Sequence, residues 1–309
     1  MPNINVPLLF IVFNRPNTTK KVFERIREAK PRRLYVAADG PRSNEEKVIC
    51  EKVRKIATNV DWDCEVKTLF QEENIGCGPG PVTGITWFFE NEEYGVILED
   101  DCVPEPTFFE FCEELLVKYR DDERIMHING NNYGADKGNF YHSEYSYHFG
   151  NMPQAWGWAS WRRAWQNFNW EINNLTELVE SDYLNILLPK KKQRSQQIKR
   201  WKQVVGGKRD IWDYQWQFSV ISNHGLTIVP KVNQISNIGF GKDATHTKNS
   251  GSYKDTLNTE VIDFPLNHPQ LVFPDSNIDQ WYKTNMVGEH ALYKHILRKI
   301  KILLGYGKV

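Results

Sequence analysis

The stretch Gly95-Val96-Ile97-Leu98-Glu99-Asp100-Asp101 joins an uninterrupted apolar run to three adjacent carboxylic acids. Such a run predicts a buried strand of a parallel sheet. Three unpaired carboxylates at its end would repel one another and lose hydration, and a divalent cation would remove both costs. Mg²⁺ or Mn²⁺ suits the site, because it binds one or two carboxylates and completes its shell with water and phosphate oxygens. The residues alone leave an equal alternative, in which the acids face the positive end of a helix after Pro104.

The segments around this stretch alternate between strand-like and helix-like patterns. Apolar runs of strand length are separated by segments whose apolar residues recur at helical spacing. This alternation predicts an α/β fold with a doubly wound, mostly parallel sheet, of the Rossmann-like kind. The expected strands, all buried and uniformly apolar, are 8–13, 34–38, 64–70, 95–98 and 124–128, and the expected helices are 17–29, 44–57, 78–90 and 104–119.

Polar residues follow four of the expected strands. Ligands of open α/β sheets bind beyond the carboxyl ends of the strands, so we expect these clusters to converge at one edge of the sheet. The clusters are Asn14-Arg15-Pro16, Asp39-Gly40-Pro41-Arg42, Asn74-Ile75-Gly76 and Glu99-Asp100-Asp101.

The alternation stops at about Tyr133, and the following residues are rich in tryptophan. This change predicts a mixed α+β region packed against the first sheet. Residues 183–209 contain nine Lys or Arg and no acid. A solvated helix face is the favoured interpretation of this run, and local attraction of phosphates is the alternative.

Composition narrows the class of protein. The 309 residues carry a formal net charge of zero, which gives no electrostatic case for a nucleic-acid partner. The five cysteines are scattered without the spacing of zinc ligands, which favours a reduced cytoplasmic protein. The apolar stretch 7–13 has no basic flank or cleavage site and is too short to span a bilayer.

Several motifs together carry a family resemblance. They run from Phe13-Asn14-Arg15 and Asp39 through Phe88-Phe89-Glu90, Glu99-Asp100-Asp101 and Pro106-Thr107-Phe108-Phe109-Glu110 to Ile128-Asn129-Gly130-Asn131-Asn132, Gly157-Trp158, Trp212-Asp213 and Gly239-Phe240-Gly241. Over roughly residues 6–250 the chain resembles N-acetylglucosaminyltransferase I and its protein-mannose relatives. Uncharacterised bacterial sugar transferases look closer still, through their Asp-Gly-Pro-Arg, Leu-Glu-Asp-Asp-Cys and Gly-Trp-Ala-Ser-Trp segments.

The resemblance implies a GT-A fold and a metal-dependent transfer of sugar from a nucleoside diphosphate, expected to be UDP. Residues 1–132 would form the nucleotide-sugar-binding half, 133–270 the acceptor and catalytic half, and 271–309 a helical tail. Within the first half, Asp101 would bind Mn²⁺ or Mg²⁺, Glu99 the donor sugar and Asp100 the ribose. Arg15, with Asn14 beside it, and Asp39 would hold the uracil. An Asx turn with Gly40 is an equal interpretation of Asp39 taken alone.

The resemblance places the catalytic base at Asp213, with Trp212 against the sugar. An inverting transfer needs one carboxylate to take the proton of the attacking hydroxyl. The family pattern is Trp-Asp-Asp-Trp, whereas this chain reads Trp212-Asp213-Tyr214-Gln215-Trp216. Because one acid is missing and the spacing differs, Asp210 is the alternative base. Surface acids beside the basic run are the non-catalytic interpretation of both.

The glycine-containing segment 239–247 matches a loop that closes over the donor in the resembled enzymes. By this resemblance, Lys242 and Thr245 of this chain would reach the phosphates, and His246 would complete the metal shell. A structural or merely exposed histidine is the more frequent interpretation of His246. Gly157-Trp158-Ala159-Ser160-Trp161 would line the acceptor side, and a core helix is the favoured interpretation of its tryptophans.

Basic and apolar residues interleave in 293–309, as in an amphipathic helix on an anionic membrane surface. A helix packed on the body is an equal interpretation. Membrane contact would suit a lipid-linked acceptor and would place the protein on the inner face of the membrane. A glycan acceptor needs no membrane contact. Two rival functions remain: a sugar nucleotidyltransferase, whose glycine-rich N-terminal loop is missing here, and a non-catalytic carbohydrate-binding protein on the same fold.

Overall fold

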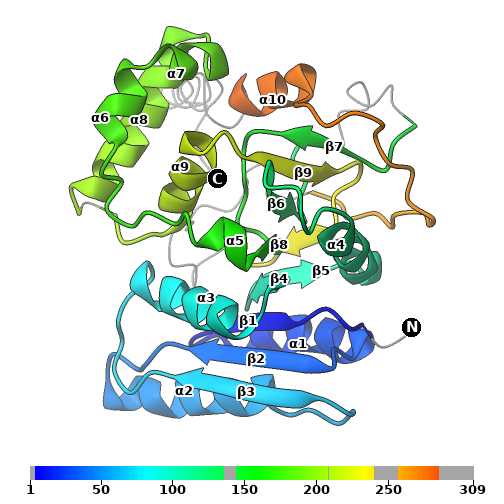
Figure 1. Ribbon diagram of the computed structural model, residues 1–309. Coiled ribbons are helices and arrows are strands. Elements are labelled where there is room, and N and C mark those ends of the chain that lie inside the picture. Colours follow the sequence, from blue (N-terminus) through cyan, green and yellow to red (C-terminus); the bar gives the residue numbers. More distant parts are fainter. Residues whose placement is uncertain (1–3, 136–143, 208, 240–256, 285–309) are drawn as a thin grey trace, which may run out of the picture.

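The computed structural model describes residues 4–135, 144–207, 209–239 and 257–284. Its main sheet has eight strands in the order β3-β2-β1-β4-β8-β6-β9-β7 (Figure 1). All strands run parallel except β7 and β8, which are antiparallel to their neighbours. The predicted α/β fold with a doubly wound, mostly parallel sheet is therefore confirmed. The strands are β1 (Leu8–Val12), β2 (Arg33–Ala38), β3 (Glu65–Phe70), β4 (Tyr94–Glu99), β6 (Ile125–Asn129), β7 (Tyr147–Gly150), β8 (Trp158–Trp161) and β9 (Leu226–Pro230).

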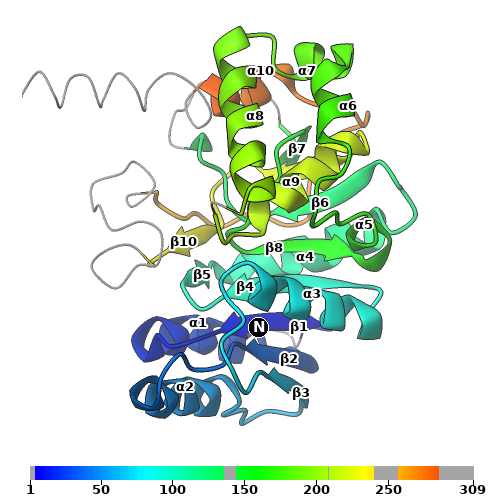
Figure 2. The same ribbon diagram turned by 90° about the vertical axis from the view of Figure 1, so that its left-hand side faces the viewer.

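Helices cover both faces of this sheet. Alternate residues of a strand point to opposite faces, so Phe10 and Leu9 of β1 belong to different cores. The face of Phe10 packs against α1 (Pro16–Ala29), α2 (Asn44–Ala57) and α4 (Pro106–Lys118). The face of Leu9 packs against α3 (Pro79–Asn91), α5 (Arg162–Trp165) and α9 (Asp213–Ser222). Figure 2 shows α1 and α2 on the side of the sheet opposite to α3.

The five strands and four helices predicted from the first 130 residues are all present, with ends within two residues of those expected. Their burial matches the prediction except in β3, where uniform burial was wrong. Glu65, Thr68 and Phe70 of β3 are exposed. The reason is position: β3 is an edge strand that pairs with β2 alone among the described strands, so both of its faces lie at the margin of the sheet and are only partly covered.

The tryptophan-rich second half does not form a separate layer but contributes three strands to the same sheet. β8 lies between β4 and β6 and runs antiparallel to both. The interpretation of its residues as a core helix was wrong, although their burial was right. Trp158 and Trp161 pack on opposite faces of the sheet, because three positions along a strand reverse the side-chain direction. Their spacing of three resembled a helical stripe because both faces are covered.

A small helical layer rests beside α9. It consists of α6 (Leu175–Glu180), α7 (Asp182–Leu187) and α8 (Lys191–Val205), packed around the fully buried Trp201. Lys191, Lys192, Lys199 and Lys202 of α8 are exposed, as expected of a solvated basic face. The segment after residue 256 returns to the body, where α10 (Ser276–Tyr282) packs beside β7. The two carboxylate oxygens of its Asp279 lie 3.1 and 3.2 Å from the backbone nitrogen of Asn151, whose N–H they accept.

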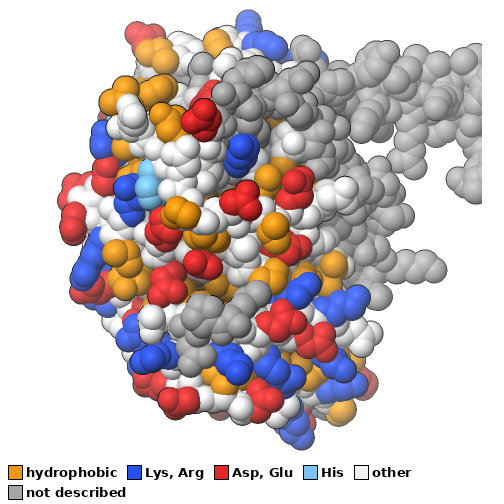
Figure 3. Space-filling view, turned by 90° about the vertical axis from the view of Figure 1, so that its right-hand side faces the viewer, with side chains coloured by type: hydrophobic (Ala, Val, Ile, Leu, Met, Phe, Trp, Pro, Cys, Tyr) orange, Lys and Arg blue, Asp and Glu red, His pale blue; other side chains and the backbone are white. Residues whose placement is uncertain are grey.

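The described surface carries mixed charge. Figure 3 shows acidic and basic side chains interspersed over the face that it draws. Among the described residues, no helix is both long enough and apolar enough to cross a membrane. The expected basic helix at 293–309 lies outside the described residues.

Two buried histidines predict a loss of stability in acid. Burial lowers the pKa of His127 and of His148 to about 3. The unfolded chain binds these protons at its ordinary pKa near 6.5, so the native state loses stability as pH falls from about 6.5 towards 3. Each histidine should cost about 2 kcal/mol of unfolding free energy between pH 7 and pH 5.

The test is urea denaturation of the wild type and of His127→Gln at both pH values. We expect the variant to be less stable at pH 7, because His127 accepts a hydrogen bond from Trp216 Nε1 at 3.0 Å. Its loss of stability on acidification should nevertheless be smaller by about 2 kcal/mol. Equal losses in the two proteins would refute a neutral buried His127.

Candidate active site

Arg15 joins the end of β1 to the acidic motif. It directly precedes Pro16, which begins α1, so the chain turns at this residue. Its Nη1 donates to Asp101 Oδ2 at 2.7 Å, and its Nε lies 3.4 Å from Asp100 Oδ2. A further short contact joins Arg15 Nη2 to Asp100 Oδ1. One guanidinium therefore pairs with both aspartates.

These residues lie where the sheet topology places ligands. β1 pairs with β2 on one side and with β4 on the other, so the strand order reverses between β1 and β4. Open α/β sheets bind ligands beyond the carboxyl ends of the strands at such a switch point. Arg15 and Glu99-Asp100-Asp101, which the sequence placed at two strand ends, are brought together there.

Burial and mutual repulsion dominate the electrostatics of the motif. Burial, followed by the charge of Asp101, raises the pKa of Glu99 to about 8. Burial also raises the pKa of Asp100 to about 6, although Arg15 acts in the opposite direction. Burial would lower the pKa of Arg15, but the charges of Asp100 and Asp101 raise it above its ordinary value. A single guanidinium thus leaves the cluster with excess negative charge, which a cation would reduce.

The second half of the chain reaches over Asp101. β5 (Cys102–Pro104) pairs antiparallel with β10 (Ile235–Asn237), which brings Asn237 Nδ2 to 3.3 Å from Asp101 Oδ1. The backbone N–H of Ile238 donates to the carbonyl oxygen of Asp101 at 2.8 Å. A Cβ at Gly239 would clash with the Asp101 carboxylate, so only glycine allows this close approach. The start of the predicted donor loop therefore lies against Asp101.

The Asp39 carboxylate accepts hydrogen bonds from Gly40 and from the loop after β3. Its carboxylate accepts from the backbone N–H groups of Gly40 at 2.8 Å, Ile75 at 2.9 Å and Gly76 at 3.2 Å. Asn74 Nδ2 donates to the same carboxylate at 2.8 Å. The Asx turn is not formed, because it would use the N–H two residues on and Pro41 has none; Asp39 instead joins the end of β2 to the loop after β3. Four donors match the capacity of a carboxylate, so a uracil would have to replace one of them.

Two other predicted residues also hold neighbouring elements. Asn14 Nδ2 donates to Glu46 Oε1 of α2 at 2.7 Å. The Asp210 carboxylate accepts from the backbone N–H groups of Cys77 and Gly78, each at 2.8 Å. Those groups precede α3, so Asp210 satisfies free donors at the positive end of that helix.

Asp213 acts electrostatically on the acidic motif, although it stands 112 positions after Asp101 in the sequence. Its charge contributes to the raised pKa of Glu99. Burial of the Cys77 thiol is the main cause of its raised pKa of about 12, and the charges of Glu99, Asp210 and Asp213 add to it. The three carboxylates therefore all act on the Cys77 thiol, and Asp210 is the one that is hydrogen-bonded at the α3 terminus.

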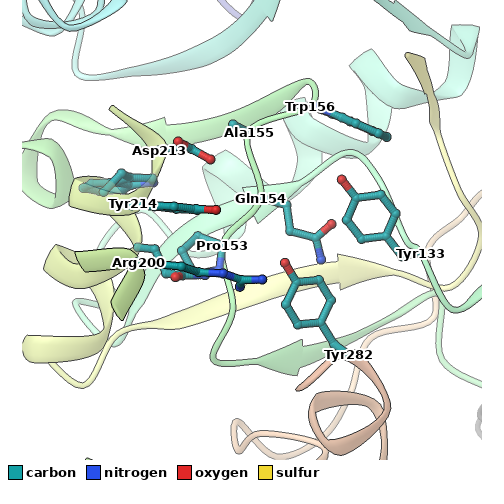
Figure 4. A pocket seen from close by; sticks show the side chains of 11 residues that line it. Tyr133, Pro153, Gln154, Ala155, Trp156, Arg200, Asp213, Tyr214 and Tyr282 are labelled. Carbon is teal, nitrogen blue, oxygen red and sulfur yellow. The ribbon is translucent and has the colours of Figure 1, made fainter. Parts of the chain in front are cut away.

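Asp213 also lines a cavity of about 160 Å³, shown in Figure 4. Side chains from α8, α9 and α10 and from the loops after β6 and β7 form its walls. The ring of Trp156 meets that of Tyr133 edge-on at 5.2 Å, and Tyr133 stacks with Tyr282 at 6.0 Å between centroids. Aromatic faces with a polar group at one end are suited to sugar rings.

Asparagines after β6 hold the cavity loop 151–156. Asn129 Oδ1 accepts from the backbone N–H of Gln154 at 2.8 Å, and Asn131 Nδ2 donates to Gln154 Oε1. His127 Nε2 lies 3.1 Å from the carbonyl oxygen of Gln154. With its side-chain oxygen so engaged, Gln154 turns its amide nitrogen into the cavity (Figure 4).

This cavity was not predicted from the sequence. Tyr133, Gln154, Trp156, Arg200 and Tyr282 line it, and none was predicted as a site residue. One signal was available, because Asn129-Gly130-Asn131-Asn132 is a fifth polar cluster at a strand end. The other residues come from loops and helices whose meeting no local pattern reveals.

Trp212, which directly precedes Asp213, is buried in the core on the α3 face of the sheet. Its ring centroid lies 5.7 Å from that of Trp158 and 6.3 Å from that of Trp165, and the residue is 5% exposed. It therefore supports the backbone at Asp213 from within the core.

The remaining predicted residues, Lys242, Thr245 and His246, lie outside the described residues. Across the described ranges, no group of three or more His, Cys, Asp or Glu has the arrangement of a metal site. Asp101 and Asp100 nevertheless suit Mg²⁺ or Mn²⁺, which needs only one or two carboxylates when water and substrate phosphates complete the shell. An ion bound there would share the Asp101 carboxylate with Arg15 at Oδ2 and with Asn237 at Oδ1.

No protein-family model matches the chain. No curated protein matches it either. A crystal structure of an active-site mutant of LgtC is similar with a TM-score of 0.36, 7% identity and 70% of each chain covered. The apo form of mouse xyloside xylosyltransferase 1 gives 0.35, 8% identity, and 72% and 83% covered. UDP-glucose pyrophosphorylase complexed with UDP-glucose gives 0.35, 11% identity, and 76% and 92% covered. None of these scores identifies a family.

Proposed function

We propose that the protein is a metal-dependent, inverting glycosyltransferase that uses a nucleoside diphosphate sugar, UDP being the expected nucleotide. One observation carries the proposal: Asp213, on the wall of a cavity, lies within electrostatic reach of Glu99 in an acidic motif at the topological switch point. A donor at the motif and an acceptor in the cavity would therefore meet beside a carboxylate. The resemblance of the motifs to N-acetylglucosaminyltransferase I supports the same assignment.

The donor would bind beyond β1 and β4. Asp101 is the proposed ligand of Mn²⁺ or Mg²⁺, with Asp100 directed to the ribose and Glu99 to the donor sugar. Arg15 would exchange its contact with Asp101 for one with the nucleotide once the cation neutralises the motif. When bound, the cation would stabilise the charge that develops on the leaving diphosphate.

The acceptor would bind in the cavity, with one hydroxyl directed to Asp213. Asp213 takes the proton of that hydroxyl as the oxygen attacks the anomeric carbon. The new glycosidic bond forms as the bond between the anomeric carbon and the phosphate oxygen breaks, and its electron pair leaves with the diphosphate. Attack from the face opposite the leaving group inverts the anomeric configuration.

Calorimetric titration of UDP into the protein, first with Mn²⁺ and then with EDTA, tests donor binding. We expect binding that requires the cation, because the unfilled motif repels phosphate. The UDP-sugars are then screened for UDP release by slow hydrolysis. Absence of binding by UDP and by the other nucleoside diphosphates, with or without the cation, would favour the non-catalytic alternative.

A second assay separates the proposed glycosyltransferase from a sugar nucleotidyltransferase. A nucleotidyltransferase incubated with UTP and sugar 1-phosphates would release pyrophosphate, whereas a glycosyltransferase releases none. Pyrophosphate without UDP release from any UDP-sugar would overturn the proposal.

A further inference from the structure

Two side chains direct polar groups into the cavity that Asp213 lines. Gln154 belongs to the loop after β7, and Tyr282 is the last residue of α10. Figure 4 shows the amide nitrogen of Gln154 and the hydroxyl of Tyr282 turned towards the same part of the cavity. Within the described ranges, neither of these two groups has a hydrogen-bond partner. Both are therefore available to a ligand.

Three neighbouring side chains hold Gln154 in this orientation. Asn131 Nδ2 donates to its Oε1, and Asn129 Oδ1 accepts from its backbone N–H at 2.8 Å. His127 Nδ1 accepts from Trp216 Nε1 at 3.0 Å, so the proton of the neutral imidazole is on Nε2. That nitrogen lies 3.1 Å from the carbonyl oxygen of Gln154 and donates to it. The amide of Gln154 therefore meets a ligand through its nitrogen, as a donor.

The hydrogen-bonding capacity of these two groups favours a carbonyl oxygen. The Gln154 amide nitrogen carries two hydrogens and the Tyr282 hydroxyl carries one, whereas the only lone pairs of the two groups are on the Tyr282 oxygen. A sugar hydroxyl would bring a further hydrogen that needs an acceptor. A carbonyl oxygen brings two lone pairs and no hydrogen, so it can accept one hydrogen bond from each residue.

The charges around Tyr282 favour a neutral ligand over an anion. Burial is the main cause of the raised pKa of Tyr282, so its hydroxyl keeps its proton at neutral pH and can donate. The charge of Arg200 opposes this rise, and the charges of Asp213 and Asp279 add to it. The carboxylates thus offset the guanidinium, which leaves an uncharged carbonyl group as the suitable acceptor of the two hydrogen bonds.

Aromatic rings provide an apolar surface beside the same two groups. The ring of Tyr133 stacks on that of Tyr282 at 6.0 Å between centroids, and the ring of Trp156 meets that of Tyr133 edge-on at 5.2 Å. Aromatic faces pack well against C–H groups. A carbonyl joined to a methyl group matches both the donors and the rings, and the acetamido group of an N-acetylated sugar has this composition.

We infer that the acceptor is an N-acetylated saccharide, whose acetamido oxygen accepts hydrogen bonds from Gln154 and Tyr282 while its methyl group packs against the aromatic rings. The assignment of this ligand as the acceptor rests on the proposed function, whereas its binding in the cavity does not. Gln154 and Tyr282 then select the acceptor and hold its attacking hydroxyl beside Asp213.

Ligand-observed NMR titrations test the inference, with the protein saturated with UDP and Mg²⁺. The probes are the methyl β-glycosides of N-acetylglucosamine and N-acetylgalactosamine, each compared with the glucoside or galactoside that carries a hydroxyl in place of the acetamido group. We expect at least one acetamido sugar to bind about tenfold or more tightly than its hydroxyl counterpart, the effect of two hydrogen bonds of ordinary net strength.

Two substitutions should remove this preference. Gln154→Glu keeps the oxygen that Asn131 contacts but replaces the donor by an acceptor, so it should abolish the preference. Tyr282→Phe keeps the stacked ring and removes only the hydroxyl, so it should reduce the preference by about threefold or more. The matched controls are Gln166→Glu at the exposed end of α5 and Tyr94→Phe at the start of β4, and both should keep the preference.

Thermal melting checks that each variant is folded, and Tyr282→Phe decides the result if Gln154→Glu is not. Equal affinities for acetamido and hydroxyl sugars in the wild type would overturn the inference, as would a preference that neither substitution changes. UDP-N-acetylglucosamine and UDP-glucose are titrated in parallel. A preference between these two donors that Gln154→Glu removes would also overturn it, because the acetamido group in the cavity would then belong to the donor.

The titrations also separate this inference from the proposed function. If UDP fails to bind, they are repeated without nucleotide or Mg²⁺. An acetamido preference that depends on Gln154 would then support the N-acetylated ligand while the glycosyltransferase assignment fails. Metal-dependent UDP binding without any acetamido preference would give the opposite result.

Discussion

Asp101→Asn should lower the metal-dependent affinity for UDP by at least about 100-fold and abolish sugar transfer. Loss of a partner that only supports a metal ligand costs about 10- to 100-fold, so loss of the ligand itself should cost at least the upper value. Asparagine keeps the size of the side chain but removes the charge that attracts the cation. UDP titrations with Mn²⁺ and a UDP-release assay measure the two effects.

The fold should persist in this variant. The substitution weakens the contact with Arg15, but it also removes the charge that most strongly repels Glu99. We expect a melting temperature within a few degrees of the wild type. Asp122→Asn is the matched control, because it makes the same change in a surface pair with Arg124 at 2.7 Å. Full metal-dependent binding in Asp101→Asn would exclude Asp101 as the ligand.

Asp213→Asn should lower kcat by about 10²- to 10⁴-fold, the range for loss of a general base. Affinity for UDP should stay near that of the wild type, because Asp213 is proposed to act on the acceptor hydroxyl. Once a transferred sugar is found, single-turnover rates and UDP titrations separate the chemical step from binding. Before that, the variant is measured by UDP titration and by its slow hydrolysis of the donor.

Asp210→Asn is the decisive comparison, since Asp210 is the alternative base. Its carboxylate accepts two backbone hydrogen bonds before α3, so we expect a loss of stability of about 0.5–2 kcal/mol, as for a helix cap. Its effect on kcat should be much smaller than that of Asp213→Asn. The reverse order of the two kcat values would assign the base to Asp210.

The first half of the molecule follows from local patterns. An apolar run of strand length such as Leu8–Val12 favours a strand covered on both faces, and the intervening stripes favour helices. The prediction was wrong at β3, where burial depends on the number of neighbours, and at β8. A spacing of three between Trp158 and Trp161 fits a helix or a strand buried on both faces, and the tertiary packing selected the strand.

Local sequence patterns predicted only part of the candidate site. The acidic motif was evident because charged residues at the end of a buried strand are costly without compensation. The hydrogen bonds from Ile75 to Asp39 and from Cys77 to Asp210 were not expected, because both donors come from the loop before α3. The pairing of Arg15 with Asp100 and Asp101 likewise depends on β1 and β4 being neighbours in the sheet.

The sequence by itself determined the alternation of strands and helices, the apolar interior of the sheet and the acidic end of β4. Each of these depends on residues close together in the chain, whose periodicity fixes which side is buried. Only the tertiary structure decided that Asn237 would contact Asp101 across 136 positions, and that Arg200 and Tyr282 would share a cavity with Asp213. The physical reason is that such contacts depend on how the elements pack together. The spacing of residues within one element does not determine that packing.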